Sequence, residues 1–266
     1  SRTGSSPSGG GRGLGLATTQ PEPMPSPRSA HWSTPADVLA ELLRADAAAP
    51  RITCYDDATG ERIELSAKVL ANWVAKAANL LQDDFDAAPG TTVGLDLPAH
   101  WRSAYWALAA WSVGATVLVG PAAPDGDVVI TTQAALAATA TQNGRDAVLV
   151  TLAALARRNP DTPAGVIDEA SELAGYPDTF APLARPSAAD PALRWDGGEA
   201  AYGELGAPGA KQGTRALAPT DLGPMLRAAV SVWRADGSIV LVHYAIGDQS
   251  RRLAAERVTL DMTEPL

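Results

Sequence analysis

The segment 206–214, Gly-Ala-Pro-Gly-Ala-Lys-Gln-Gly-Thr, contains residue types that could bind a phosphate. Its glycines could expose backbone amides to an anion, and Lys211 could add a positive charge. The segment lacks the run of hydroxyl residues of a phosphate loop, and it does not match the Walker pattern, which needs Gly-Lys directly before Ser or Thr. We take Gly209, Lys211, Gly213 and Thr214 as candidate nucleotide-binding residues, with an ordinary flexible loop as the alternative.

Histidine and cysteine offer little further chemistry. The three histidines, His31, His100 and His243, are isolated from one another and show no paired ligand spacing of a metal site. Cys54 is the single cysteine, which excludes an intramolecular disulfide and a cysteine-cluster metal site. The sequence therefore assigns no metal-binding residue.

Three other polar residues stand beside predicted strands. Asp96 and His243 each follow a strand at its expected carboxyl end, where ligand sites of α/β sheets gather. A solvated loop residue is the alternative for both. Ser112 stands in an imitation of a nucleophile elbow, but it follows a helix and precedes a strand, the reverse of an elbow. We therefore assign no catalytic residue.

Tryptophan is frequent, with seven residues against two phenylalanines. Trp101 and Trp111 fall on one face of a predicted helix, so we expect them in the core. Trp32 and Trp195 stand in loop-like contexts and are expected to be free to contact a partner.

The composition restricts the class of protein. Lys and Arg total 21 against 30 Asp and Glu, a net charge of −9, which argues against a binder of nucleic-acid backbones. Hydrophobic residues make up 46%, so the chain is not disordered throughout. The apolar runs are far shorter than the ~18 residues of a membrane span, and the N-terminus lacks the order of a signal peptide. We expect a cytoplasmic protein whose partner is an unknown small molecule or protein, with no nucleic acid and no membrane.

The N-terminal segment differs from the rest of the chain. Ser, Gly and Pro supply 19 of residues 1–35, which cannot bury enough apolar surface to offset chain entropy, so we expect a disordered tail. A helix then starts at Thr34, a plausible N-cap, with Pro35 at the first helical position and Asp37 as the acid of a capping box. We expect one α/β domain over 36–266, with possible subdomains 36–160 and 190–266.

Hydrophobic periodicity in this domain predicts strands that alternate with helices. The expected strands are 51–55, 62–65, 91–97, 115–119, 128–132, 147–151, 238–243 and 257–260. The expected helices are 34–43, 66–81, 101–111, 132–141, 152–158, 222–233 and 248–256. We expect loops and one or two short elements over 159–210. The alternation indicates mainly parallel sheets covered by helices.

A weak internal repeat supports two related subdomains. Trp111 and Gly114 stand before the aliphatic strand 115–119, and Trp233 and Gly237 stand before the strand 238–243. Each unit therefore ends in a tryptophan-bearing helix, a glycine and a strand.

Three stretches carry a resemblance to the AMP-binding, acyl-CoA-synthetase-like superfamily. Residues 63–70 resemble an early strand-to-helix motif, residues 98–121 a helix, glycine, strand and proline segment, and residues 254–260 a later helix-to-strand step. The chain resembles an uncharacterised actinobacterial family distantly similar to the N-terminal domain of these adenylate-forming enzymes. The resemblance covers about 37–160 and 220–262 and implies an α/β fold with mainly parallel sheets and two related subdomains.

The resemblance implies less about activity. Active members of the superfamily use a Ser/Thr/Gly-rich phosphate loop ending in Lys-Gly and a catalytic lysine from a separate C-terminal domain. Segment 206–214 departs from that loop, and the chain ends at Leu266, before the later motifs are expected. The resemblance thus implies a truncated scaffold, and no catalytic residue carries over.

Three functions remain open. The leading hypothesis is a non-catalytic relative of AMP-dependent acyl-CoA synthetases that binds a small molecule or a protein. An alternative is a divergent ATP-dependent, carboxylate-activating ligase that uses segment 206–214, and only this alternative implies ATP and Mg²⁺ as cofactors. The third is a homo-oligomeric structural module.

Overall fold

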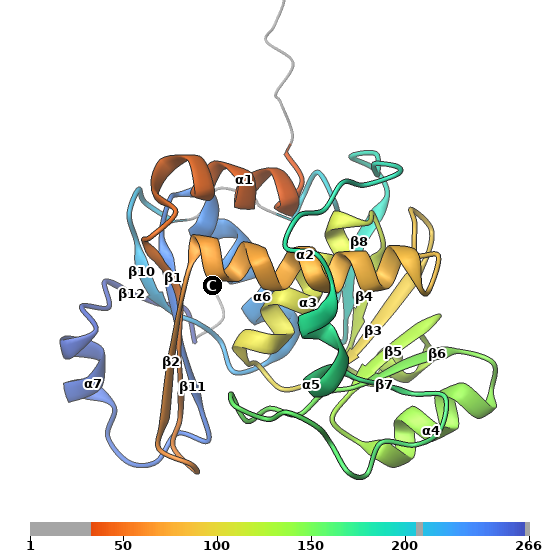
Figure 1. Ribbon diagram of the computed structural model, residues 1–266. Coiled ribbons are helices and arrows are strands. Elements are labelled where there is room, and N and C mark those ends of the chain that lie inside the picture. Colours follow the sequence, from red (N-terminus) through yellow and green to blue (C-terminus); the bar gives the residue numbers. More distant parts are fainter. Residues whose placement is uncertain (1–32, 206–209, 264–266) are drawn as a thin grey trace, which may run out of the picture. The chain divides into compact units, whose positions relative to one another are not determined.

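The computed structural model describes residues 33–205 and 210–263 of the chain, so most of the expected tail 1–35 lies outside the described residues. Two sheets dominate this part (Figure 1). Sheet A has the strand order β12-β10-β11-β1-β2, and sheet B has the order β7-β6-β5-β3-β4-β8-β9. Every pair is parallel except β1–β2 and β8–β9, so the expected fold class is confirmed.

The strands of sheet A are β1 (Pro50–Asp56), β2 (Glu61–Ser66), β10 (Arg215–Leu217), β11 (Ser238–His243) and β12 (Leu260–Asp261). Those of sheet B are β3 (Thr92–Asp96), β4 (Thr116–Val119), β5 (Val128–Thr131), β6 (Asp146–Leu149), β7 (Ile167–Asp168), β8 (Pro191–Trp195) and β9 (Gly198–Ala201). The α-helices are α1 (Pro35–Asp46), α2 (Ala67–Asp83), α3 (Trp101–Ser112), α4 (Ala134–Gln142), α5 (Glu169–Glu172), α6 (Leu222–Arg234) and α7 (Ser250–Ala255). Two 3-10 turns, η1 (Gly120–Asp125) and η2 (Leu173–Gly175), complete the described elements. Among the described residues, no helix has both the length and the apolar character needed to cross a membrane.

The start of α1 is fixed by local chemistry, as the sequence predicts. The hydroxyl oxygen of Thr34 accepts a hydrogen bond from the Asp37 amide at 3.1 Å, and the Asp37 carboxylate accepts one from the Thr34 amide at 2.9 Å. Pro35 occupies the first helical position, where its missing N–H costs nothing. The capping box is therefore confirmed.

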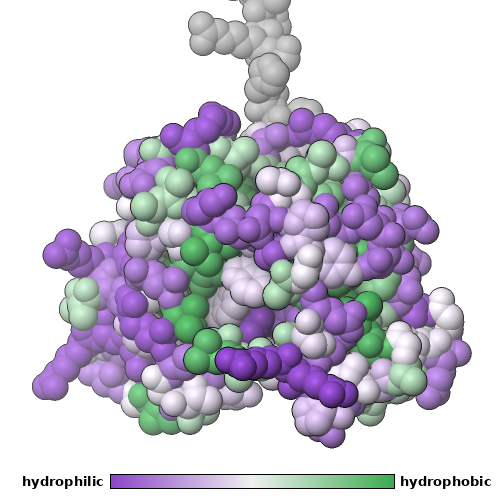
Figure 2. Space-filling model, in the orientation of Figure 1, coloured by the Kyte–Doolittle hydropathy of each residue, from purple (hydrophilic) through white to green (hydrophobic). Residues whose placement is uncertain are grey.

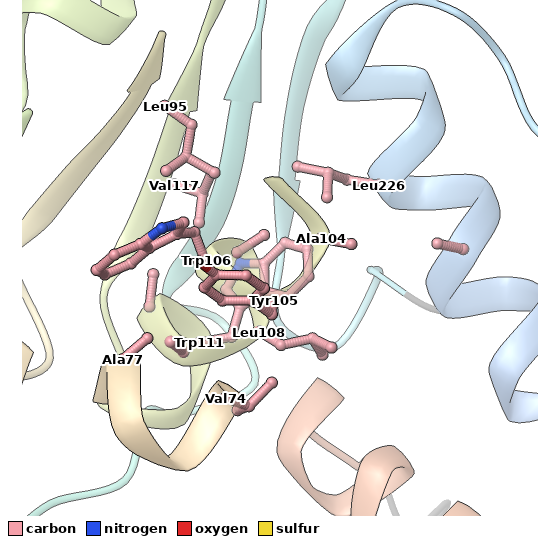
Figure 3. Packing of buried hydrophobic residues seen from close by; sticks show 14 of the residues in the cluster. Val74, Ala77, Leu95, Ala104, Tyr105, Trp106, Leu108, Trp111, Val117 and Leu226 are labelled. Carbon is pink, nitrogen blue, oxygen red and sulfur yellow. The ribbon is translucent and has the colours of Figure 1, made fainter. Parts of the chain in front are cut away.

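Helix α3 is the centre of the core. It contacts β1 of sheet A and β3 and β4 of sheet B, and all twelve of its residues are buried. Figure 3 shows its aromatic side chains among aliphatic side chains of α2, α6 and sheet B. The sequence predicts burial of one face only. The whole helix is buried because it lies between two sheets, which agrees with its sequence of alanines and aromatic residues and its single charged residue, Arg102.

Sheet B has helices on both faces. Val128 and Ile130 of β5 join the core cluster that contains α3, whereas Val129 packs with Ala137 of α4 in a second cluster. Chain connections from the adjacent strands β3 and β5 therefore lead to opposite faces of the sheet. This arrangement creates a topological switch point between their carboxyl ends, the usual place for a ligand in α/β sheets.

Two expectations about 152–210 were wrong. No helix forms over 152–158; the Ala153 carbonyl accepts one turn hydrogen bond from the Ala156 amide at 3.3 Å, and the carbonyls of Leu152 and Ala153 also accept hydrogen bonds from the Arg102 guanidinium. The following region contains more regular structure than expected, including the β8–β9 hairpin, which joins sheet B beside β4.

Strands from both ends of the domain meet in each sheet. β1 pairs with β11 in sheet A, and β4 pairs with β8 in sheet B, so the sheets do not follow the expected limits 36–160 and 190–266. The repeated tryptophans still have equivalent contacts. Trp111 donates to the Ala192 carbonyl of β8 at 2.8 Å, and Trp233 donates to the Arg51 carbonyl of β1 at 3.1 Å. Each helix is thus bound to the strand that neighbours its own following strand: α3 precedes β4 and contacts β8, and α6 precedes β11 and contacts β1.

Candidate functional site

A cavity of about 600 Å³ opens at the carboxyl ends of three strands of sheet B. Its walls are Leu95–Ala99 after β3, Val119–Pro121 after β4, Trp195–Gly197 after β8 and Thr220–Pro224 at the start of α6. Both the size, within roughly 300–1,000 Å³, and the position at the carboxyl edge are those of small-molecule sites. This cavity is the candidate functional site.

Asp96 lies at the switch point, where its side chain connects the carboxyl ends of β3 and β5. Its carboxylate accepts a hydrogen bond from the Thr131 hydroxyl at 2.6 Å and one from the Gln133 side-chain amide at 2.9 Å. The predicted position of Asp96 at the carboxyl end of a strand is confirmed. Its orientation is fixed by its neighbours, which makes it a rigid acceptor at the cavity wall.

Two further carboxylates line the cavity without partners of their own. Asp196 lies in the β8–β9 turn and Asp221 is the N-cap residue of α6, and neither side chain has a hydrogen bond or ion pair among the described residues. Asp221 places a negative charge at the N-terminal end of α6, although its side chain makes no capping hydrogen bond to the first amides of the helix. Within 33–205 and 210–263, no Lys, Arg or His side chain lines the cavity. The wall is acidic.

Trp195 forms part of the wall and is held by its own chain. A Cβ atom at Gly223 would lie 2.6 Å from the Trp195 Cβ atom, so only glycine allows this approach of α6 to β8. The Arg227 guanidinium lies 5.0 Å from the indole centroid. The expected loop-like context of Trp195 was wrong, because it is the last residue of β8 and half-buried, and its availability to a partner stays a prediction. Trp32 lies outside the described residues.

Two histidines, His100 and His243, lie near the carboxyl ends of the sheet A strands. His100 directly follows Ala99, which lines the cavity. His243 is the last residue of β11, as predicted, and its ring centroid lies 6.1 Å from that of His100. Burial, with contributions from Arg102 and His243, lowers the pKa of His100 to about 3. Burial also lowers the pKa of His243, against the opposing effect of Asp56. Both rings are neutral at neutral pH.

These histidines form no metal centre with their neighbours. Within 33–205 and 210–263, no group of three or more His, Cys, Asp or Glu side chains is placed to hold a metal ion. His31 lies outside the described residues.

The candidate phosphate residues lie at a different edge of the molecule. Thr214 directly precedes β10, so it marks the amino end of a sheet A strand rather than a carboxyl end. The Gly213 amide donates to the Ala235 carbonyl at 2.7 Å, and the Thr214 amide donates to the Lys211 carbonyl at 3.1 Å. Gly209 lies outside the described residues. The structure does not bring Lys211, Gly213 or Thr214 to the cavity, and their phosphate-binding role stays a prediction.

Ser112 and Cys54 are not placed as nucleophiles. The Ser112 hydroxyl donates to the Leu108 carbonyl at 2.7 Å within α3. Cys54 is buried in β1, and burial raises the pKa of its thiol to about 12, which keeps it protonated.

Sequence reasoning missed Asp196 and Asp221. The Asp196-Gly197 pair between two short apolar segments is a hairpin signal, and it could have identified the turn. No local sequence pattern predicts that Asp221 lies near Asp196. Both residues line the cavity because the fold places the start of α6 beside the end of β8.

The fold is that of the N-terminal domain of adenylate-forming enzymes. The acyl-CoA synthetase of Brucella canis matches with a TM-score of 0.66 and 16% identity, over 86% of this chain and 47% of that chain. The anthranilate CoA ligase AuaEII, in complex with anthranoyl-AMP, matches with a TM-score of 0.64 and 15% identity, over 86% and 48%. The N-terminal domain of FACL13 from Mycobacterium tuberculosis matches with a TM-score of 0.62 and 13% identity, over 86% of this chain and 62% of that chain.

In sequence, the chain is similar to a TIGR03089 family protein of Mycobacterium tuberculosis, an actinobacterium. The two are 40% identical over 154 residues, which cover 56% of this chain and 63% of the relative. The chain therefore spans less than two thirds of this relative and of the solved structures it matches. It matches no protein-family model. The expected resemblance to an actinobacterial group with the adenylate-forming fold is confirmed.

Proposed function

We propose that this chain is a small-molecule-binding domain that uses the adenylate-forming fold without forming an adenylate by itself. The ligand occupies the cavity at the carboxyl edge of sheet B. The observation that supports the proposal is the charge of the wall, where Asp96, Asp196 and Asp221 lie with no cationic side chain from the described part of the chain.

The acidic wall determines the class of ligand. A phosphate is favoured by cationic side chains, a metal ion or free backbone amides. Among the described residues no cationic side chain lines this wall, and Asp221 adds a negative charge at the N-cap of α6 without making a capping hydrogen bond. A ligand that offers N–H or O–H donors or a positive charge would meet the partnerless carboxylates of Asp196 and Asp221. The related ligase AuaEII was solved with anthranoyl-AMP, so this fold has room for a ligand of that size. We infer that a neutral or cationic molecule binds here.

A screen sorted by charge tests this function. Ligand-observed NMR with size-matched cationic, neutral and anionic fragments is expected to give neutral and cationic hits. The double variant Asp196→Asn/Asp221→Asn should weaken those hits. Asp161→Asn, which neutralises an exposed carboxylate outside the cavity, should not. A majority of anionic hits, or hits that ignore the double variant, would overturn the proposal.

The absence of adenylation is tested separately. ATP–pyrophosphate exchange with a panel of carboxylic acids is expected to stay at background. Exchange that Lys211→Ala abolishes in a folded protein would instead support the ligase alternative and its use of segment 206–214.

A further inference from the structure

The segment 176–185, here called the strap, leads from η2 towards β8 without forming a helix or strand, and it runs past α2 (Figure 1). It lies between two buried residues, Leu173 of η2 and Pro186. Eight of its ten residues are exposed, and Tyr176 and Phe180 are half-buried against the core. On the face drawn in Figure 2, hydrophobic residues lie among hydrophilic ones where the strap passes α2. Because the strap buries little apolar surface between two buried ends, it can open while the core stays folded.

Helix α2 holds the main chain of the strap with two side-chain amides. The Asn79 nitrogen donates to the carbonyls of Pro177 at 3.1 Å and Thr179 at 2.9 Å. Gln82 stands three residues further along α2, on the same face, and its side-chain oxygen accepts from the Leu183 amide at 3.0 Å. Loss of one neutral hydrogen bond changes an equilibrium by about fivefold, so a few such bonds close the strap without locking it.

Two ion pairs fasten the strap to the neighbouring helices. Asp178 pairs with Lys76 of α2 at 2.8 Å, and Arg185 pairs with Asp37 of α1 at 2.6 Å. Both strap residues of these pairs are exposed, so water and salt weaken the attraction. The strap thus reaches from α2 to α1, and reversible polar contacts hold it at both helices.

The strap also forms part of the wall of a second cavity, of about 470 Å³. Phe180 and Pro182 supply apolar surface from the strap, and Leu39 of α1 and Val74 of α2 line other parts of the wall. None of the residues of this cavity lines the acidic one. Movement of the strap away from α2 would therefore expose apolar walls to solvent and leave the acidic cavity unchanged.

We propose that the strap is a hinged lid of this second cavity, which opens and closes as one unit about its two buried ends. Asn79 and Gln82 latch the lid to α2, and the pair of Arg185 with Asp37 latches it to α1. The structure describes the closed form, in which Phe180 packs against the core. In the open form, Phe180 and the apolar wall reach solvent. The lid acts independently of the acidic cavity and of its proposed ligand.

Native-state proteolysis measures the opening. Chymotrypsin can cut after Phe180 and after Leu183, both within the strap, and mass spectrometry of the fragments identifies the bond that is cut. When opening and closing are faster than cleavage, the rate follows the population of the open form. Opening of the strap exposes little surface, so the rate should stay nearly constant at urea concentrations below the unfolding transition. A rate that climbs with urea as steeply as global unfolding does would overturn the proposal.

Two latch variants test the contacts with α2. Asn79→Ala removes two hydrogen bonds, and alanine keeps α2 helical, so cleavage in the strap should accelerate about tenfold or more. Gln82→Ala should accelerate it about fivefold. The matched control is Gln142→Ala at the end of α4, an exposed residue whose side chain makes no hydrogen bond among the described residues, and it should leave the rate unchanged.

The two cleavage sites test whether the strap opens as one unit. Each latch variant should accelerate cleavage after Phe180 and after Leu183 by the same factor. If Asn79→Ala affected only the first bond and Gln82→Ala only the second, the strap would fray locally, and the lid would be disproved. Rates equal to that of the parent in both latch variants would also overturn it. If Asn79→Ala fails to fold, Gln82→Ala and its control still decide.

Discussion

Two arginine–glutamate pairs, one at the core and one on the outer face of sheet A, show how burial determines what such a pair does. At the core, Glu169 accepts hydrogen bonds from Arg102 at 3.1 Å, from the Trp106 indole at 3.0 Å and from the Tyr105 hydroxyl. Its side chain is 1% exposed. Burial raises the pKa of Glu169 to about 7, in spite of the Arg102 charge.

In the outer pair, Glu256 with its arginine partners, hydrogen bonding outweighs burial, so the pKa of the glutamate is lowered instead of raised. Burial alone would raise the pKa of Glu256, but hydrogen bonds from Tyr55, Arg215 and Arg62 together outweigh it and lower that pKa to about 2. Glu256 follows α7, so this network fastens α7 to the face of sheet A. The core region is held by apolar packing with a costly ion pair inside it, and the outer region by polar contacts near water.

Removal of the core arginine should give the largest effect. Arg102→Leu leaves Glu169 buried without its cation and removes the guanidinium hydrogen bonds to the Leu152 and Ala153 carbonyls, so we expect a loss of about 3–5 kcal/mol in the free energy of unfolding. Urea denaturation measures it. The double variant Arg102→Leu/Glu169→Leu should recover part of the loss, and a double variant as unstable as the sum of the singles would contradict the coupling.

The pH dependence of stability should separate the two glutamates. Because the folded pKa of Glu169 is raised from 4.5 to about 7, the unfolded state loses its proton first. The free energy of unfolding should therefore fall as pH rises from about 4.5 to 7, by up to about 1.4 kcal/mol per pH unit. Urea denaturation across this range should show the slope in the parent and not in Glu169→Gln. A variant that keeps the full slope would disprove this assignment.

Glu256 should show the opposite sign in a different pH window. Its folded pKa is lowered, so its contribution is present above about pH 4.5 and is lost as pH falls towards 2. Glu256→Gln should cost about 1 kcal/mol at pH 7, since the network is partly solvated. The difference from the parent should vanish near pH 2. A cost that persists there would mean that the side chain stabilises α7 by packing rather than by charge.

The smallest effect belongs to the acidic cavity. Asp196→Asn/Asp221→Asn changes two exposed groups without partners, so the free energy of unfolding should move by no more than about 0.5 kcal/mol. Thermal unfolding provides the check. A larger loss would assign these carboxylates to the fold rather than to a ligand.

How much could be predicted from the sequence depended on how local each feature is. The capping box at Thr34 and the strand at 238–243 involve neighbours in sequence, and both were correct. The single turn that stands in place of the expected helix over 152–158 contacts Arg102, some fifty residues away, and no local pattern reveals that contact. Asp96 was found because a strand's carboxyl end can be predicted locally. The acidic cavity as a whole could not be, because β8 reaches β4 only through the fold.

The most direct test of the proposed function is thermal unfolding with Mg-ATP and with AMP at millimolar concentration, in the parent and in Lys211→Ala. A ligand at 100 times its dissociation constant adds about 2.7 kcal/mol, which for a domain of this size raises the midpoint by roughly 5–10 °C. The acidic cavity predicts no shift with either nucleotide. A clear shift with Mg-ATP or AMP that disappears in Lys211→Ala would contradict the account and place phosphate binding at segment 206–214.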